Sequence, residues 1–192
     1  MLCLVKGKVM SVRTLINDII GFYLWQGKYW LIFTYLVTLV ASIIIIVFGL
    51  KKRLNKTCIF CFCLLTFWIT TVITLTVLCR KTGSSWRYNL NPLWSWRRVF
   101  LGKRKGFLLV IENILLLMPI GFLLPLIDRN YWKMRLTVLA GFLFSLGIEL
   151  CQLFLKRGQF ELDDLINNTL GVLIGYCAVK SVLLIRDHFF SK

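Results

Sequence analysis

Nine polar side chains lie inside long apolar segments of the chain or directly beside them. They are carboxylates, amides and one guanidinium: Glu112, Asn113, Glu149, Gln152, Arg157, Asp163, Asp164, Asn167 and Asn168. A charged side chain at the centre of a bilayer costs about 2.5–3.5 kcal/mol on insertion scales. Such carboxylates can act as general bases, and an arginine can hold an anionic group. We therefore predict a polar pocket that faces a protein interior or water.

The chain carries no familiar catalytic signature that would use these groups. It has no nucleophile–base pair, phosphate-binding loop or H-E-x-x-H motif, so the sequence does not name a reaction. A C-x-x-C element spans Cys58 to Cys61, but it begins an apolar run, lacks a second pair and is far from the single histidine, His188. We therefore expect no metal site and no cofactor. The odd number of cysteines, seven, argues against a disulfide framework.

Five long apolar segments must position the polar groups. Hydrophobic residues make up 58% of the 192 residues and charged residues only 17%, which is too apolar for a soluble domain of this size. A membrane helix needs about 20 apolar residues. The segments that qualify are Tyr29–Leu50, Cys58–Cys79, Phe107–Ile127, Leu136–Leu155 and Leu165–Ile185. Because they are too long for barrel strands, we expect an all-α, polytopic membrane bundle of about five helices.

Topology brings the polar groups to one side of this bundle. The third and fourth segments are antiparallel, so the start of one and the end of the other open at the same membrane face. Segments 80–106 and 156–164 belong to that face as well. Pro119 and Pro125 interrupt the third segment, and we expect them to kink it and to frame a pocket.

Helical spacing places polar residues of the last two segments on defined faces. The fourth segment carries them at Ser145, Glu149 and Gln152. The fifth carries a stripe at Asp164, Asn168, Gly171 and Gly175. Its two glycines form a G-x-x-x-G pair, which allows another helix to approach closely. We expect the polar end of this stripe to press against the Glu149 face.

Each of these features also has a purely structural explanation. Asp163 or Asp164 could cap the fifth helix, a role that aspartate favours. Glu149 could be a protonated, hydrogen-bonded structural group, or Arg157 could be its counter-ion. The amides could join helices, and the glycines could serve packing alone. These explanations do not account for the collection of all the groups at one depth on one side.

The net charge of +16 lies between the apolar segments and not in a nucleic-acid motif. We therefore expect contacts with lipid headgroups and no nucleic-acid partner. Lys and Arg number 14 on the side of segment 80–106 and 9 on the other side. The densest cluster, in segment 51–57, lies on the other side, so the positive-inside rule leaves the orientation open.

The chain divides into three parts. Residues 1–28 form a tail that we interpret as containing an interfacial helix over Val12–Leu24. Residues 29–79 form two N-terminal transmembrane helices. Residues 80–192 form a core with three transmembrane helices and contain all nine candidate pocket residues.

Four sequence elements occur in the order and spacing of a known family. They are N-L-N-P (Asn89–Pro92), E-N-I-L-L-L-M-P-I-G (Glu112–Gly121), S-L-G-I-E-L-C-Q (Ser145–Gln152) and R-G-Q-F-E-L-D-D-L-I-N-N-T-L-G (Arg157–Gly171). With them the chain resembles the VanZ-like family of bacterial membrane proteins over roughly Asn89–Tyr176. It departs from the family pattern at Leu93, where an aromatic residue is usual, and at Asn91, where an apolar residue is usual.

The resemblance implies a multi-pass protein of the bacterial cytoplasmic membrane with a role against antibiotics. The role is reduced susceptibility to teicoplanin-type glycopeptides and lipoglycopeptides through an envelope effect, without a stated mechanism. Membrane lipids, a lipid-linked envelope precursor or a glycopeptide antibiotic are the partners that it implies. It also suits a polar layer that faces outside.

Two other hypotheses remain open from the residues themselves. A membrane-embedded enzyme could act on a lipid-linked or headgroup substrate, with Glu149 or Asp164 as general base and Arg157 on an anionic group. A small-solute or proton carrier could use Glu112 and Glu149.

Overall fold

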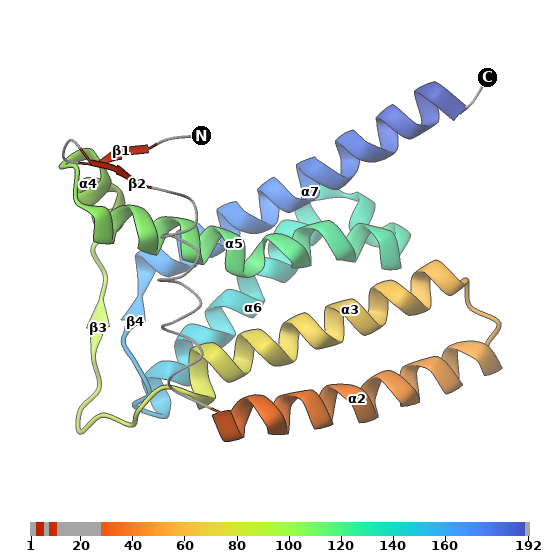
Figure 1. The fold of residues 1–192 in the computed structure, drawn as a ribbon, viewed down its shortest axis with the longest axis horizontal. Coiled ribbons are helices and arrows are strands. Elements are labelled where there is room, and N and C mark those ends of the chain that lie inside the picture. Colours follow the sequence, from red (N-terminus) through yellow and green to blue (C-terminus); the bar gives the residue numbers. More distant parts are fainter. Residues whose placement is uncertain (1–2, 6–7, 11–27, 191–192) are drawn as a thin grey trace.

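Five membrane-length helices form the body of the molecule (Figure 1). The computed structural model describes residues 3–5, 8–10 and 28–190. The elements in chain order are β1 (Cys3–Val5), β2 (Lys8–Met10), α2 (Lys28–Lys51), α3 (Lys56–Ile73), the π-helical turn η1 (Thr74–Leu78), β3 (Tyr88–Asn89), α4 (Trp94–Phe100), α5 (Arg104–Ile127), the 3-10 helix η2 (Arg129–Trp132), α6 (Met134–Phe154), β4 (Phe160–Glu161) and α7 (Leu162–Phe190). The interfacial helix predicted over Val12–Leu24 lies outside the described residues.

The prediction of an all-α membrane bundle is confirmed. Each apolar segment coincides with a helix that is long and apolar enough to cross a membrane: Trp30–Lys51, Lys56–Leu78, Arg104–Ile127, Met134–Phe154 and Leu162–Arg186. Helices α3, α5, α6 and α7 begin two or three residues before the predicted segments, in flanks where lipid headgroups and water satisfy polar side chains. Helix α5 continues through Pro119 and Pro125, so neither proline ends it.

Helices α5 and α7 pack backbone against backbone. A Cβ atom on Gly171 would collide with the carbonyl group of Ile114 on α5, and one on Gly175 would collide with that of Met118. The expected close approach at the G-x-x-x-G pair is therefore made by α5, while the expectation of contact with the Glu149 face concerns only the polar end of the stripe. Helical periodicity defines a face of a helix, but it does not say which neighbour covers that face.

Val172 lies where α5, α6 and α7 meet, and it is fully buried. A Cβ atom on Gly121 of α5 would collide with the Val172 backbone, and one on Gly141 of α6 would collide with the Val172 side chain. Leu117 and Ile148 complete this part of the core. The three C-terminal spans thus form one tightly packed unit.

Helix α2 packs along α3 and η1 through pairs of threonine hydroxyls. Thr38 Oγ1 lies 2.7 Å from Thr70 Oγ1, and Thr34 pairs with Thr74 in the same way. Hydroxyl pairs of this kind join helices in lipid, where apolar burial alone does not. Much of the remaining α2 surface is exposed and apolar, including Ile44, which is 61% exposed.

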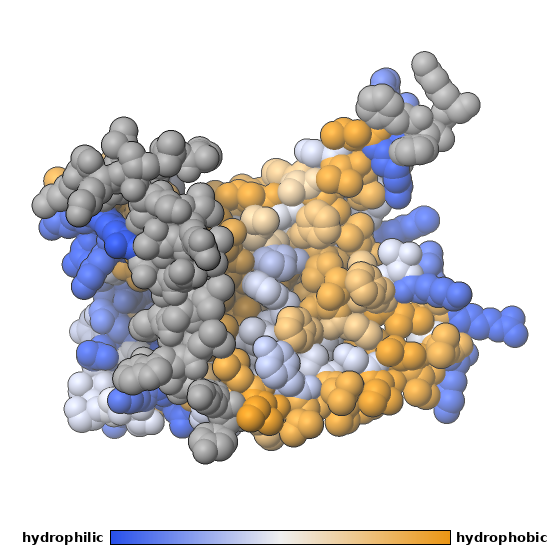
Figure 2. Space-filling view, in the orientation of Figure 1, coloured by the Kyte–Doolittle hydropathy of each residue, from blue (hydrophilic) through white to orange (hydrophobic). Residues whose placement is uncertain are grey.

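Charged residues gather at the ends of the bundle, and the face between them is apolar (Figure 2). One end carries α4 together with β3 and β4, which pair in parallel with Tyr88 opposite Phe160. The other end carries the α2–α3 connection and η2. Segment 80–106, expected to be a loop, therefore contains a helix and a strand of its own.

Candidate functional site

Helix α4 receives its N-terminal cap from α7. Asp163 Oδ2 accepts a hydrogen bond from the backbone N–H of Ser95 at 3.3 Å and another from Asn167 Nδ2 at 3.2 Å. The residue before α4 is Leu93, which has no side-chain oxygen and adopts a left-handed conformation with φ of 56°. The suggestion that Asp163 caps the start of its own helix is therefore wrong, because this carboxylate oxygen caps α4.

Two tryptophans of α4 also donate hydrogen bonds to residues of β4 and α7. Trp94 Nε1 donates to Glu161 Oε2 at 2.9 Å, and Trp96 Nε1 donates to Asn167 Oδ1 at 2.7 Å. Tryptophan combines a large apolar ring with one N–H donor. These two residues therefore join a short helix to polar groups that would otherwise be buried without partners.

Helix α6 holds β4 and α7 through Glu149 and Ser145. Glu149 is only 1% exposed, and its Oε2 atom accepts the backbone N–H of Glu161 at 2.8 Å. One turn away, Asn168 Nδ2 donates to Ser145 Oγ at 2.9 Å. Asn168 thus reaches the polar face of α6, unlike the glycines further along its stripe.

The π-helical turn η1 supplies backbone acceptors to this network. Gln152 Nε2 donates to the Thr76 carbonyl, and Arg157 Nη1 donates to the Leu78 carbonyl, each at 3.2 Å. A π turn widens the helix by one residue and is frequent at functional sites. Arg157 is thus committed to the backbone of the second span and does not act as the counter-ion of Glu149.

A cavity of about 430 Å³ lies beside this buried network, between the end of the second span and the start of α5. Its charged and amide lining residues are Arg80, Lys81, Arg87, Glu112, Asn113 and Asp164. Asn113 Nδ2 donates to Asp164 Oδ1 at 2.6 Å, which fixes one wall between α5 and α7. Three cations and two carboxylates therefore share one space at the end of the bundle that carries α4.

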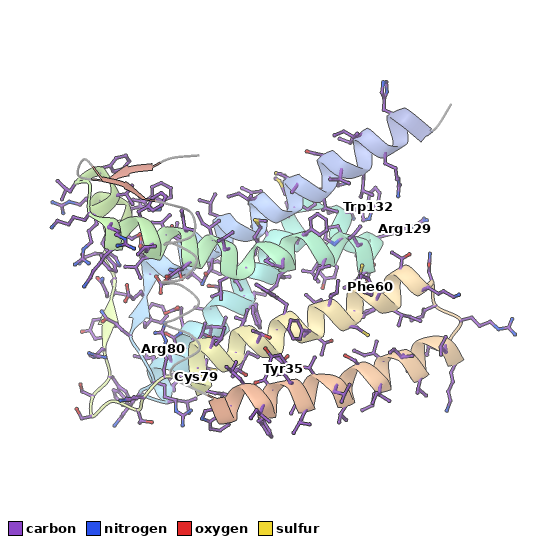
Figure 3. The ribbon with its side chains drawn as sticks, in the orientation of Figure 1. Tyr35, Phe60, Cys79, Arg80, Arg129 and Trp132 are labelled. Atoms are coloured by element: carbon purple, nitrogen blue, oxygen red, sulfur yellow. The ribbon has the colours of Figure 1, made fainter. Side chains whose placement is uncertain are left out.

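Arg80 is the cation that links the cavity to the buried network. Its Nη1 atom donates to Gln152 Oε1 at 3.3 Å. The side chain passes over Gly158, where a Cβ atom would lie 2.8 Å from Nη1. Its charge acts on the carboxyl groups of Glu149, Glu161 and Asp164. Figure 3 shows Arg80 beside Cys79, at the end opposite Arg129 and Trp132.

The structure divides the nine predicted pocket residues into two groups. Those that line the cavity are Glu112, Asn113 and Asp164. Those that belong to the buried network are Glu149, Gln152, Arg157, Asp163, Asn167 and Asn168. They lie in adjoining layers, so the expected single shared cavity is replaced by an open cavity with a closed support behind it.

The family model VanZ/LLP1 matches residues 34–185, which is most of the chain. The chain belongs to the VanZ-like family. The match extends on the N-terminal side beyond the motifs, which begin at Asn89, and so includes the second span and most of the first. Neither the curated proteins nor the solved structures that were compared match the chain.

The VanZ-like motifs fall on both layers of the site. Glu112 and Asn113 begin the Pro-containing motif and line the cavity. The E-x-x-Q pair of α6, Glu149 and Gln152, lies in the buried support. Sequence reasoning did not identify Arg80 as a site residue, although it directly follows the second span on the face that carries segment 80–106.

An apolar groove of about 200 Å³ adjoins the cavity of this VanZ-like protein between α3 and α5. Leu75 and Glu112 line both spaces. Trp68 forms part of the groove wall, and its Nε1 atom donates to the Leu116 carbonyl at 2.7 Å. Leu115, also in the wall, is 48% exposed, so the groove lies at the lipid-facing surface of the bundle.

Glu161 has a raised pKa at the edge of the VanZ-like site. Burial of its carboxyl group raises the pKa above the ordinary value of 4.5. The hydrogen bond from Trp94 and the positive charge of Arg80 oppose this shift, while the charge of Asp163 adds to it. Protonation of Glu161 therefore becomes easier when the chain folds.

The cavity has the chemistry to bind a ligand that carries an anionic group beside a hydrogen-bond donor. Guanidinium and ammonium groups form strong, charge-assisted bonds to phosphate or carboxylate oxygens. Glu112 and Asp164 add carboxylate oxygens that accept from hydroxyl or amine groups. Within the part of the chain that the structure describes, no three His, Cys, Asp or Glu residues are grouped so that they could hold a metal ion.

Proposed function

We propose that this VanZ-like protein acts in the bacterial cytoplasmic membrane and lowers susceptibility to teicoplanin-type glycopeptides and lipoglycopeptides through a change in the envelope. The observation that carries the proposal is the cavity with Arg80 and Glu112 at one end of the bundle, in a protein of this family. Envelope precursors and membrane lipids carry anionic headgroups at the depth of such a cavity. Its cations and carboxylates are chemically suited to them.

Drug susceptibility of cells tests this proposal. The full chain is expressed in a susceptible bacterium, and the inhibitory concentrations of teicoplanin and of a lipoglycopeptide are measured. We expect both to rise severalfold, while an antibiotic that acts on the ribosome remains unaffected. Arg80→Gln and Glu112→Gln should abolish the rise at equal protein abundance, and Arg135→Gln, at the other end of the bundle, should retain it. Unchanged concentrations with well-expressed protein would count against the proposal.

A second candidate function is catalysis on a lipid-linked or headgroup substrate. Asp164, Glu112 and Arg80 line one cavity, which places two carboxylates and an anion-binding group in a common space. Asp164 is the better candidate base because it lines the cavity, whereas Glu149 is buried outside the cavity lining. Arg80 replaces Arg157 as the candidate for holding the anion.

Lipid analysis separates this enzyme hypothesis from a structural role. Cells that express the protein should show a new or depleted lipid species by mass spectrometry, and Asp164→Asn should remove that change at unaltered protein abundance. Loss of the lipid change together with loss of the protein would indicate a structural role for Asp164.

The carrier hypothesis requires Glu112 and Glu149 on one solvent path. Glu112 lines the cavity, whereas Glu149 is 1% exposed and holds β4. A proton or cation flux into proteoliposomes that depends on both acids would favour the carrier over the envelope effect.

A further inference from the structure

We propose that the cavity binds the phosphate-bearing headgroup of a membrane lipid while the lipid chain lies in the groove between α3 and α5. This inference rests on the proposed function for its role in the cell, and it names the class of ligand. Its basis is the continuity of a cation-lined cavity with an apolar groove, since Leu75 and Glu112 line both.

The cations of the cavity determine the phosphate position. Lys81 and Arg87 are exposed, and Arg80 uses one nitrogen for a long bond of 3.3 Å to Gln152. A guanidinium has five N–H donors in a planar fork that matches phosphate oxygens. The segment that supplies these three residues, 80–106, contains eight Lys and Arg and no Asp or Glu. Its field therefore attracts anions to the cavity.

The carboxylates of the cavity further restrict which headgroups it can bind. Glu112 and Asp164 carry carboxyl oxygens that accept hydrogen bonds from hydroxyl or amine groups attached to a phosphate. Asn113 holds Asp164 in place at 2.6 Å. The site thus favours a phosphate with neighbouring O–H or N–H donors, such as phosphatidylglycerol, over phosphatidylcholine, whose headgroup has no such donor.

The groove explains why the ligand is a lipid and not a soluble phosphate. Its wall is apolar apart from Glu112 and Thr71, and it borders the exposed side chain of Leu115. A soluble anion gains nothing from such a surface, whereas a chain of CH₂ groups is in contact with apolar atoms throughout. Leu75, at the junction, would contact the part of the lipid between the headgroup and the chain.

The molecule provides a matched control on its other side. A second groove of about 420 Å³ lies between α6 and α7, and its only charged lining residue is Arg135. It combines an exposed arginine with an apolar wall but lacks carboxylates and neighbouring cations. Arg135 therefore represents ordinary contact with surrounding lipid.

The test is lipid titration of the full-length protein in detergent, followed by native mass spectrometry. We expect phosphatidylglycerol to bind in preference to phosphatidylcholine, and Arg80→Gln to weaken phosphatidylglycerol binding about tenfold. Leu75→Trp, which fills the junction, should weaken it as well. The double variant Lys81→Gln with Arg87→Gln changes only exposed side chains. It should also weaken phosphatidylglycerol binding, and it tests the inference if Arg80→Gln fails to fold. Arg135→Gln should bind like the parent.

Two results would overturn the inference. Equal binding of both lipids by every variant would identify surrounding lipid only. Displacement of phosphatidylglycerol by inorganic phosphate at comparable concentration would identify a soluble anion as the ligand. Selective lipid binding without any change in drug susceptibility would remove the proposed function and leave the lipid site. Drug susceptibility that depends on Arg80 without selective lipid binding would remove the lipid site and leave the proposed function.

Discussion

The indole of Trp96 is placed where a simple apolar ring would leave a polar atom unsatisfied. Asn167 is fully buried, and its Oδ1 atom accepts the Trp96 N–H at 2.7 Å. Replacing Trp96 by Phe keeps a ring but removes the donor, so we expect a loss of about 1–3 kcal/mol in the free energy of unfolding. Thermal unfolding in detergent measures this loss as a lower midpoint.

Trp86 provides the control for this prediction. It is 66% exposed, and its ring lies 5.7 Å below the Lys156 ammonium, a contact that Phe also permits. Trp86→Phe should therefore leave the midpoint unchanged. Equal midpoints for both variants would mean that the Trp96 hydrogen bond does not hold α4 in place.

Glu161 gives the stability of the protein a defined dependence on pH. Because folding raises its pKa above 4.5, the folded chain binds this proton more tightly than the unfolded chain does. The favourable contribution is present below 4.5 and is lost as the pH rises through the raised value. Glu161→Gln keeps an acceptor for Trp94 and removes the titration. Its unfolding midpoint should fall less than that of the parent between pH 4.5 and neutrality, and parallel curves would contradict the assignment.

At this scale the sequence indicates which residues are polar inside apolar segments, but not where each one points. Glu112, Asn113 and Asp164 line the cavity, while Arg157 turns to a backbone carbonyl. Side-chain direction depends on neighbours from other segments, and Arg80 was missed because a cation at the end of a span is ordinary in membrane proteins.

Helix packing between α5 and α7 depends on two glycines, which have no side chain to keep the backbones apart. Gly171→Ala and Gly175→Ala each place a methyl group against backbone carbonyls of α5, which cannot move aside as a side chain can. We expect each substitution to cost about 1–3 kcal/mol through overpacking. Thermal unfolding and the yield of monodisperse protein both report the loss.

Gly147 on α6 is the matched control for these glycines. Apart from its own stretch of helix, no heavy atom lies within 4 Å of the position that its Cβ would take. Gly147→Ala should therefore leave the midpoint unchanged or raise it, because alanine favours a helix over glycine by up to about 1 kcal/mol. A loss equal to that of Gly171→Ala would attribute the effect to helix flexibility and not to close packing.

Elements could be predicted where hydropathy alone defines them. All five spans were found from apolar length, with most N-terminal boundaries two or three residues late. Helix α4 was missed, because its seven residues depend on partners such as Asp163, 68 positions away. The π-helical turn η1 was missed too. Its hydrogen bond from the Cys79 N–H to the Thr74 carbonyl spans five residues, and no local sequence pattern predicts such a bond.

The whole molecule has two chemically different ends. Cysteine labelling can measure directly which end faces the outside of the cell. Ser84 and Asn55 are exposed residues at opposite ends of the bundle. We expect Ser84→Cys to react in intact cells with a thiol reagent that cannot cross the membrane, and Asn55→Cys to react only after permeabilisation. This orientation agrees with the dense basic loop 51–57 on the cytoplasmic side.

The reverse labelling pattern would place the cavity in the cytoplasm. A direct encounter with an antibiotic outside the cell would then be excluded, while an effect on lipid or precursor supply would remain. The parent protein, labelled in parallel, corrects for its own cysteines, of which Cys151 and Cys177 are exposed.

Val172 contacts its two neighbouring helices through different parts of the residue. It touches α5 through its backbone and α6 through its side chain. An added methyl group, as in Val172→Ile, therefore increases the volume of the side chain that packs against Gly141 of α6. Because α6 also carries Glu149 and Gln152, this substitution shifts the support behind the cavity from a distance, without altering a single polar atom.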